Sequence, residues 1–223
     1  MPDMKEFKNQ TDNLKYSNAS PLRITQVLLP VVVSIVLSIC ISVNCHASSK
    51  GKINPNSLFR IEINTATQQL AVFYNNEMAK KPIYVFPCST GIYDNTFTGT
   101  FSTSDYYDWR SVMGGVWARY AVRFNGNELI HSVPYYRHSP DSLEYEEYNK
   151  LGERASLGCC RLCVRDAKWI YENTKPGTQV DVIDDANIKY PLTYPQIFIN
   201  CNDKIKRSWD PTDPDSASPW NSR

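Results

Sequence analysis

The chain has 223 residues, a net charge of +1 and 42% hydrophobic residues, a composition typical of a globular protein with one core. The near-zero charge gives no electrostatic support for nucleic-acid binding, so nucleic acid is not an expected partner. Internal repeats and low-complexity segments do not stand out.

The first notable element is an uncharged apolar segment at residues 24–43, which is long enough to span a bilayer. Lys and Arg are more frequent in residues 1–23 than just after the segment, a weak positive-inside bias. Small residues follow, and Cys45-His46-Ala47 would suit a signal peptidase. We therefore expect either a membrane anchor preceded by a cytoplasmic stub, residues 1–23, or a cleaved secretion signal. In both cases the remainder lies outside the cytoplasm.

Residues 44–56 are small and polar and are expected to form a linker to a folded domain at residues 57–184. Alternating or continuous β-prone residues predict strands, the first two joined as a hairpin. One helix is predicted at 164–173, because apolar residues recur at helical spacing before Pro176-Gly177. The domain is therefore predicted to be mainly β, a sandwich or partly open barrel with one or two short helices. The predicted strands are 59–64, 69–74, 81–86, 98–101, 120–124, 128–131 and 179–183.

Residues 185–223 lose this periodicity and are rich in proline and aspartate. Two interpretations stay open for this tail. It is either disordered or a strap whose Trp209 and Trp220 dock on the domain.

Five cysteines follow the apolar segment, and an odd number outside the cytoplasm indicates at least one free thiol. Cys160 and Cys163 have the CxxC spacing, but neither a second such pair nor an HxxxH pair accompanies them, so no metal is expected.

The residues around Cys159 have features of a nucleophilic site. A thiol attacks as thiolate, so it needs a base or a positive field nearby. Gly158 permits a tight turn before the sulfur, and the dipole of the following helix would favour an anion there. His131, at the end of an apolar strand, is a candidate base. Each residue alone has an ordinary alternative: Cys159 as an inert buried thiol, and His131 as a hydrogen-bonded strand-end residue.

Motifs in a fixed order support the nucleophilic interpretation. His131-Ser132 is followed by Ser156-Leu157-Gly158-Cys159 and Arg161-Leu162, and is preceded by STG at 89–91 and TGTF at 98–101. From about residue 86 to 184 the chain resembles the L,D-transpeptidase catalytic domain (YkuD domain), whose signature is His-Gly/Ser and then Ser/Thr-His-Gly-Cys. The tail sequence WDPTDPD resembles that of Gram-positive members.

The resemblance implies a site and a reaction. Cys159 would be the nucleophile, His131 its base, and the Ser132 carbonyl would orient the imidazole. Backbone N–H groups around Gly158 and Cys159 would form the oxyanion hole. Ser156 and Arg161 would bind substrate, although a structural ion pair is an equal alternative for Arg161.

In this family Cys159 would be acylated by the stem tetrapeptide of peptidoglycan, without a cofactor. Transfer to an amine of a second stem would give a 3→3 cross-link. Transfer to water would make the protein an L,D-carboxypeptidase. A non-catalytic cell-wall-binding module is a third alternative.

Two features depart from the family pattern. Leu157 replaces the family's His, and residues 134–155 form a longer insertion with tyrosines and a glutamate cluster. The insertion is either a solvated loop or a lid whose Tyr145 and Tyr148 contact the donor stem or glycan.

The neighbouring thiols are expected to be inert. Adjacent side chains of an extended chain face opposite ways, so Cys160 should be buried when Cys159 faces the site. Cys163 should be a weak helix cap or a packed thiol. A disulfide among Cys160, Cys163, Cys88 and Cys201 is the alternative.

Overall fold

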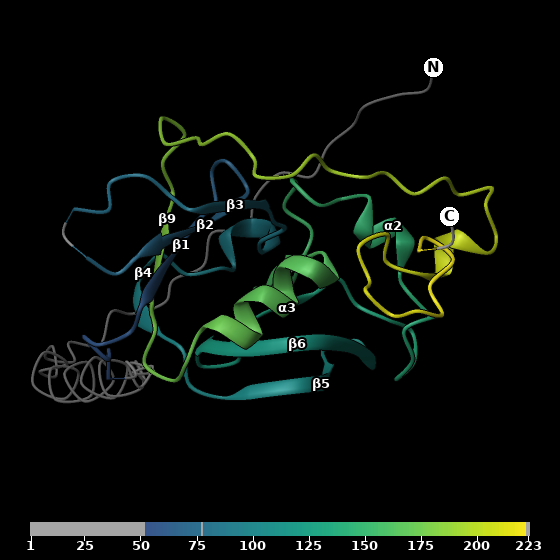
Figure 1. The fold of residues 1–223 in the computed structure, drawn as a ribbon, viewed down its shortest axis with the longest axis horizontal. Coiled ribbons are helices and arrows are strands. Elements are labelled where there is room, and N and C mark those ends of the chain that lie inside the picture. The colour runs from purple at the N-terminus through teal and green to yellow at the C-terminus, as the bar shows by residue number, and fades with distance from the viewer. Residues whose placement is uncertain (1–51, 77, 222–223) are drawn as a thin grey trace, which may run out of the picture. The chain divides into compact units, whose positions relative to one another are not determined.

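The computed structural model describes residues 52–76 and 78–221 (Figure 1). The predicted membrane or signal segment at 24–43 therefore lies outside the described residues. Within them, none of the helices has the length and apolar character needed to cross a membrane.

The first sheet has five strands in the order β3-β2-β1-β9-β4. β1 and β2 form the antiparallel hairpin predicted from the sequence, and β1 also pairs in parallel with β9. The alternation of β1 places Ile61 and Ile63 in the core at zero exposure. The strands are β1 (Phe59–Asn64), β2 (Gln69–Tyr74), β3 (Tyr84–Pro87), β4 (Gly99–Ser102) and β9 (Gln179–Ile183).

The second sheet has four strands in the order β5-β6-β7-β8. β5, β6 and β7 run as an antiparallel meander, whereas β7 and β8 are parallel. Parallel neighbours need a long connection, and here it contains the insertion at 134–155. The strands are β5 (Tyr106–Val112), β6 (Val116–Asn125), β7 (Glu128–Ser132) and β8 (Cys160–Leu162).

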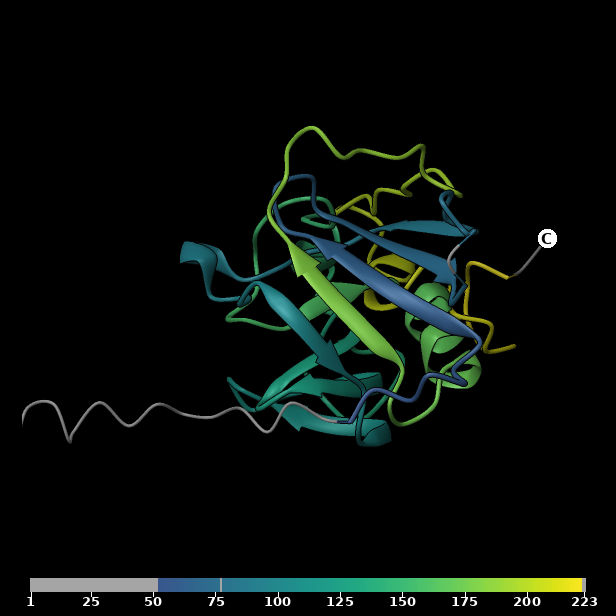
Figure 2. The same cartoon turned by 90° about the vertical axis from the view of Figure 1, so that its left-hand side faces the viewer.

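The helix α3 (Val164–Asn173) has the bounds predicted from the sequence and packs on both sheets (Figures 1 and 2). Trp169 contacts the rings of Phe59 and Tyr84 of the first sheet. Tyr171 contacts the rings of Tyr106 and Tyr120 of the second. The predicted mainly β domain is confirmed as two sheets with two short helices, the second being α2 (Tyr145–Tyr148).

The insertion and the tail both pack on this domain. Tyr135 and Tyr148 of the insertion join the main core, at 0% and 2% exposure. Trp220 of the tail packs against the same core and donates from Nε1 to the Lys206 carbonyl at 2.9 Å. The strap interpretation is therefore confirmed for Trp220, while Trp209 is half-buried. Two 3₁₀ turns complete the elements, η2 (Ile92–Asp94) and η3 (Lys206–Ser208).

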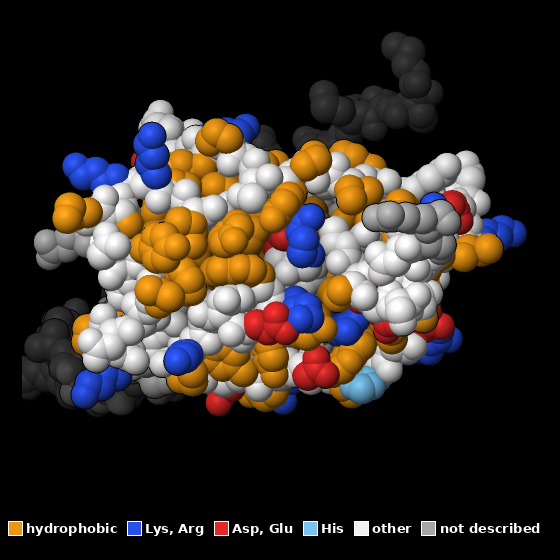
Figure 3. Space-filling view, in the orientation of Figure 1, with side chains coloured by type: hydrophobic (Ala, Val, Ile, Leu, Met, Phe, Trp, Pro, Cys, Tyr) orange, Lys and Arg blue, Asp and Glu red, His pale blue; other side chains and the backbone are white. Residues whose placement is uncertain are grey.

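The face drawn in Figure 3 carries hydrophobic side chains over the region of β1, β2 and β3 beside α3. Phe59, Tyr74, Tyr84 and Trp169 form connected ring contacts there. These ring contacts hold the four side chains in place although they remain partly exposed to solvent.

Candidate active site

The parallel pair β7 and β8 places the two predicted catalytic residues on neighbouring segments of the chain. His131 lies opposite Arg161 and Ile130 opposite Cys160. Arg161 therefore shares a face with His131, and Cys159 lies in the bend that directly precedes β8.

His131 has the arrangement expected of a general base. Its side chain is buried, and Nδ1 lies 2.5 Å from the Ser132 carbonyl oxygen. A carbonyl only accepts, so Nδ1 carries the proton and Nε2 is left as the acceptor. Burial lowers the pKa of His131 to about 4. The Ser132 carbonyl opposes this shift, and the Arg161 charge adds to it. The imidazole is therefore neutral and able to take a proton at neutral pH.

Cys159 is partly exposed, and its Sγ lies 3.9 Å from the Asn127 carbonyl oxygen. Burial raises the pKa of the Cys159 thiol. The Leu129 N–H acts in the opposite direction, and the nearby Glu128 charge raises the pKa further. The resting pair is thus a neutral thiol and a neutral imidazole. A preformed thiolate is not favoured, so a nucleophilic role for Cys159 would need a base to take its proton.

The turn at residues 156–159, here called the nucleophile turn, is tightly fixed. Gly158 has φ +144°, and a Cβ at this position would lie 3.1 Å from the Asn95 carbonyl oxygen. Ser156 Oγ donates to the Cys159 carbonyl at 2.6 Å and accepts the Gly158 N–H at 3.1 Å. Thr96 Oγ1 donates to the Gly158 carbonyl at 2.7 Å. Both polar backbone groups of Gly158 are therefore engaged.

These contacts correct two sequence-based expectations. Ser156 is buried at 1% exposure and shapes the turn, so it does not offer its hydroxyl to a substrate. The Gly158 N–H is bound by Ser156 and is not available to an oxyanion. Glycine is required at 158 for conformation and space, as predicted.

The expected helix dipole at Cys159 is also corrected. β8 (Cys160–Leu162) separates the thiol from α3, which begins at Val164. The Val164 N–H is bound by Asp210 Oδ2 at 2.8 Å. A carboxylate of the tail therefore satisfies this helix N-terminus.

Arg161 forms the structural ion pair that the sequence left open. Its Nη1 lies 2.5 Å from Glu147 Oε2 and 3.1 Å from the Ala155 carbonyl oxygen. The pair joins α2 to β8, and its guanidinium is only slightly exposed. Arg161 thus holds the insertion against β8.

The two tyrosines assigned to a substrate-contacting lid lie in different environments. Tyr148 is 2% exposed and belongs to the core, so the expectation that it contacts substrate is not met. An apolar ring on the inner side of α2 is better packed than solvated. Tyr145 is half-buried, with the Arg207 guanidinium 5.3 Å from its ring centroid.

The neighbouring thiols match their predicted placements. Cys160 and Cys163 are buried at 0% and 4% exposure, so Cys160 faces away from the site and Cys163 is a packed thiol without a capping bond. Burial raises the pKa of both thiols well above the ordinary value, and Cys160 also hydrogen-bonds Cys88. All five cysteines of the described residues are unpaired. Among these residues, no group of three or more His, Cys, Asp or Glu side chains is suited to hold a metal ion.

Sequence reasoning missed Glu128, a buried carboxyl at the start of β7. It accepts hydrogen bonds from the Phe97 N–H at 3.2 Å and from Asn125 Nδ2 at 2.7 Å. Burial raises the pKa of Glu128, and the two donors oppose this shift. The sequence signal for Glu128 was a single acidic residue at the start of an apolar strand. A carboxyl buried in such a place is rarely without partners.

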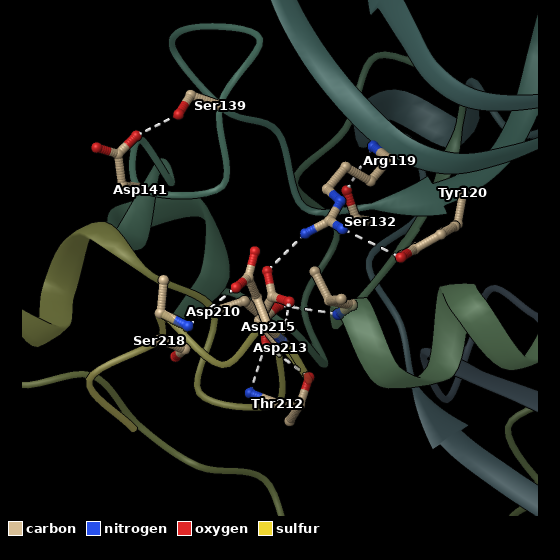
Figure 4. Close-up of polar contacts among 12 residues, drawn as sticks. Arg119, Tyr120, Ser132, Ser139, Asp141, Asp210, Thr212, Asp213, Asp215 and Ser218 are labelled. Carbon is tan, nitrogen blue, oxygen red and sulfur yellow. Dashed lines mark hydrogen bonds and ion pairs between the residues drawn. The ribbon is translucent and has the colours of Figure 1, made fainter. Parts of the chain in front are cut away.

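A second missed group connects the tail to Ser132, the residue after His131 (Figure 4). Asp213 Oδ2 pairs with Arg119 Nη1 at 2.6 Å, and both side chains are largely buried. The backbone N–H of Arg119 donates to Ser132 Oγ at 2.9 Å. Ser132 also supplies the carbonyl that binds His131. The buried ion pair is therefore connected to Ser132 through the backbone of Arg119, and Ser132 in turn contacts the His131 ring.

The family of the L,D-transpeptidase catalytic domain (YkuD) matches residues 59–182, more than half of the chain. The chain therefore belongs to this family, as the sequence motifs predicted.

Individual proteins and solved structures are similar to parts of this chain. The Bacillus subtilis (strain 168) protein named "Putative L,D-transpeptidase YciB" is 45% identical over 56 residues, which cover 25% of this chain and 28% of that protein. A structure of an L,D-transpeptidase from Stackebrandtia nassauensis is 20% identical, with a TM-score of 0.45 over 63% of this chain and 62% of its own. For L,D-transpeptidase 3 from Mycobacterium tuberculosis in complex with a faropenem-derived adduct, the identity is 22% and the TM-score 0.42, over 57% and 60%. The family assignment rests on the domain match rather than on these similarities.

Proposed function

We propose that the protein is a peptidoglycan L,D-transpeptidase that forms 3→3 cross-links through an acyl-enzyme on Cys159. The observation that carries this proposal is the position of Cys159 directly before β8, the strand that pairs with β7 at His131, with Nδ1 of His131 bound to the Ser132 carbonyl. This arrangement leaves a neutral ring nitrogen to serve a neutral thiol.

The first half-reaction forms the acyl-enzyme. His131 Nε2 takes the proton of Cys159 while Sγ attacks the carbonyl carbon of the third residue in the donor stem. The C–N bond to the terminal D-residue then breaks, and the departing amine receives the proton from His131. Because Gly158 N–H is engaged by Ser156, we assign the oxyanion to the Cys159 N–H.

The second half-reaction releases the product. An amine of a second stem attacks the thioester and gives its proton to His131. The C–S bond breaks, and His131 returns the proton to sulfur. Tyr93, Phe97 and Leu157 are 88%, 64% and 56% exposed and flank the nucleophile turn. We assign apolar contacts with the stem peptides to this rim, with Leu157 in the place of the family's His.

We also propose that the domain acts outside the cytoplasm, either anchored by residues 24–43 or secreted to the cell wall. The proposed substrate lies there, and the apolar segment precedes the domain. Protease added to intact cells should digest a C-terminal tag. A tag that is protected until lysis contradicts this location.

The direct test of the function is incubation of the purified protein with tetrapeptide-containing muropeptides, followed by mass spectrometry. Cross-linked dimers that have lost one terminal D-residue are the expected product. Tripeptides alone would identify an L,D-carboxypeptidase. Unchanged muropeptides, together with no acylation of Cys159, would contradict an enzymatic role.

A further inference from the structure

A pocket of about 410 Å³ lies between the insertion, residues 134–155, and the tail, residues 185–221. This insertion–tail pocket lies within the size range of small-ligand sites, roughly 300–1,000 Å³. The side chains that define its chemistry are Tyr136, Arg137, Asp141, Tyr145, Glu146 and Arg207.

The walls of the pocket are already ordered. Ser142 Oγ donates to the Ser139 carbonyl at 2.8 Å, and its own carbonyl accepts the Tyr136 N–H at 2.8 Å. The loop between them also carries the Ser139–Asp141 hydrogen bond drawn in Figure 4. Leu143 N–H donates to the Ser208 carbonyl at 2.9 Å, which ties the insertion to the tail. Binding of a ligand would therefore cost little conformational entropy at this site.

An aromatic contact fixes the same loop to the second sheet. The His138 ring lies 4.7 Å from the ring centroids of both Trp109 and Trp117. Trp109 is on β5 and Trp117 is on β6, and both strands belong to the sheet that carries His131. The pocket wall is thus connected to the catalytic sheet.

The lining combines ring faces with balanced charge. Tyr136 is 58% exposed, although its neighbour Tyr135 is fully buried. The Glu146 carboxylate interacts with the hydroxyls of Tyr136 and Tyr145. Arg137 and Arg207 supply two positive charges, and Asp141 and Glu146 supply two negative ones.

This chemistry selects among ligand classes. An anionic ligand would meet two carboxylates, and a purely apolar one would remove water from charged groups such as the Arg137–Asp141 pair. A pyranose ring has apolar faces for the tyrosines and hydroxyl or acetamido groups for the charged side chains. The lining is therefore complementary to a neutral saccharide.

We propose that the insertion–tail pocket binds the glycan backbone of peptidoglycan, as a subsite separate from Cys159. The proposal rests on the proposed function, which places the substrate in a sugar–peptide polymer. α2 connects the two places, because Tyr145 and Glu146 line the pocket while Glu147 pairs with Arg161, the register partner of His131. A sugar held here would raise the local concentration of its own stem peptide near the site.

The binding test uses the intact chain and a β-1,4-linked N-acetylglucosamine tetramer, measured by calorimetry. Tyr136→Ala should weaken binding at least tenfold. Tyr194→Ala is the matched control, because its ring is also exposed, at 39%, but lies outside the pocket. It should bind the tetramer like the unaltered protein. No binding by the unaltered protein at millimolar tetramer, or equal binding by Tyr136→Ala, overturns the proposal.

A kinetic test separates this inference from the proposed function. Tyr136→Ala should raise KM at least fivefold for a disaccharide-tetrapeptide, with kcat unchanged and with the free tetrapeptide turned over normally. A KM that is unchanged for both substrates overturns the glycan subsite and leaves the transpeptidase intact. Tetramer binding by a protein whose Cys159 is never acylated would reject the function but keep the saccharide site.

Discussion

The nucleophile turn and the tail are both irregular, but different interactions hold them in place. The turn is fixed by the backbone conformation of Gly158 and by two side-chain hydroxyls, those of Ser156 and Thr96. The tail is fixed by buried carboxylates, with Asp210 bound to the Val164 N–H and Asp213 paired with Arg119. A turn that needs glycine can be predicted from neighbouring residues, whereas the partner of a buried carboxylate lies far along the chain.

The electrostatic cost of the two solutions differs as well. The polar atoms that hold the turn are uncharged, so burying them costs little once they are hydrogen-bonded. Asp210 and Asp213 are buried at 0% and 1% exposure. Burial raises the pKa of Asp210 to about 6, although bonds from Thr212 and Val164 oppose this shift. The tail is therefore the more sensitive of the two to loss of a single partner.

The largest expected effect concerns activation of the Cys159 thiol, which we expect the nucleophile turn not to achieve without a base. If its geometry were sufficient to activate Cys159, the base on β7 would be dispensable. We expect His131→Gln to slow acylation by a carbapenem about 10²- to 10⁴-fold, since proton transfer by a positioned base contributes that much. Stopped-flow or mass-spectrometric adduct kinetics at pH 7 would measure it. A loss of less than tenfold would show that the turn activates the thiol by itself.

The next effect breaks the tail. Asp213→Ala leaves the Arg119 guanidinium buried without its partner, so unfolding free energy should fall by about 3–5 kcal/mol. Asp105→Ala is the control, because its pair with Arg123 is on the surface with a 56% exposed carboxylate and should cost under about 1 kcal/mol. Urea denaturation of both variants provides the comparison. Equal losses would mean that burial of the tail's carboxylate is not what holds it.

The sequence predicted the turn better than the tail for a physical reason. Gly158 before Cys159 indicates a tight turn without knowledge of the rest of the fold, and the hairpin β1–β2 and α3 follow from local periodicity. Arg119 lies 94 residues from Asp213, and no local pattern couples them. β8 was missed because three residues are too few for a periodic signal, and β5 because polar residues interrupt its alternation. The burial of Tyr148 likewise depends on how the insertion folds back.

A smaller effect tests the conformational part of the turn. Gly158→Ala adds a Cβ 3.1 Å from the Asn95 carbonyl oxygen at a positive φ, so we expect about 1–3 kcal/mol of destabilisation and slower acylation. Gly114→Ala is the matched control, with φ +96° but nothing within 4 Å of the new Cβ. It should lose stability only through its φ. Thermal melts and adduct yield should rank Gly158→Ala as the worse variant, and the reverse order would remove the close approach from the account.

The smallest effect is the opposite pH dependence of two contributions to stability, those of His131 and of Asp210 in the tail. The pKa of His131 is lowered to about 4, so its contribution to stability is present above its unfolded value of about 6.5 and is lost as pH falls toward 4. The pKa of Asp210 is raised to about 6, so its contribution is present below its unfolded value of about 3.9 and is lost as pH rises through 6. The two trends oppose each other between pH 4 and 6.

Asp210→Asn should remove the second trend. Unfolding free energy of this variant should therefore fall more steeply between pH 6 and 4.5 than that of the unaltered protein, by about 1 kcal/mol or more. Urea denaturation at the two pH values measures the difference. Parallel pH dependences would show that Asp210 does not titrate in this window.

The central claim is that Cys159, and neither neighbouring thiol, is the nucleophile. Intact-protein mass spectrometry after incubation with a carbapenem tests it most directly, on Cys159→Ala and Cys160→Ala side by side. We predict no adduct on Cys159→Ala, because the Cys159 thiol is partly exposed whereas those of Cys160 and Cys163 are buried. Cys160→Ala should form the full adduct with some loss of stability, since it truncates a buried side chain. A full adduct on Cys159→Ala, or its loss only in Cys160→Ala, would contradict the account.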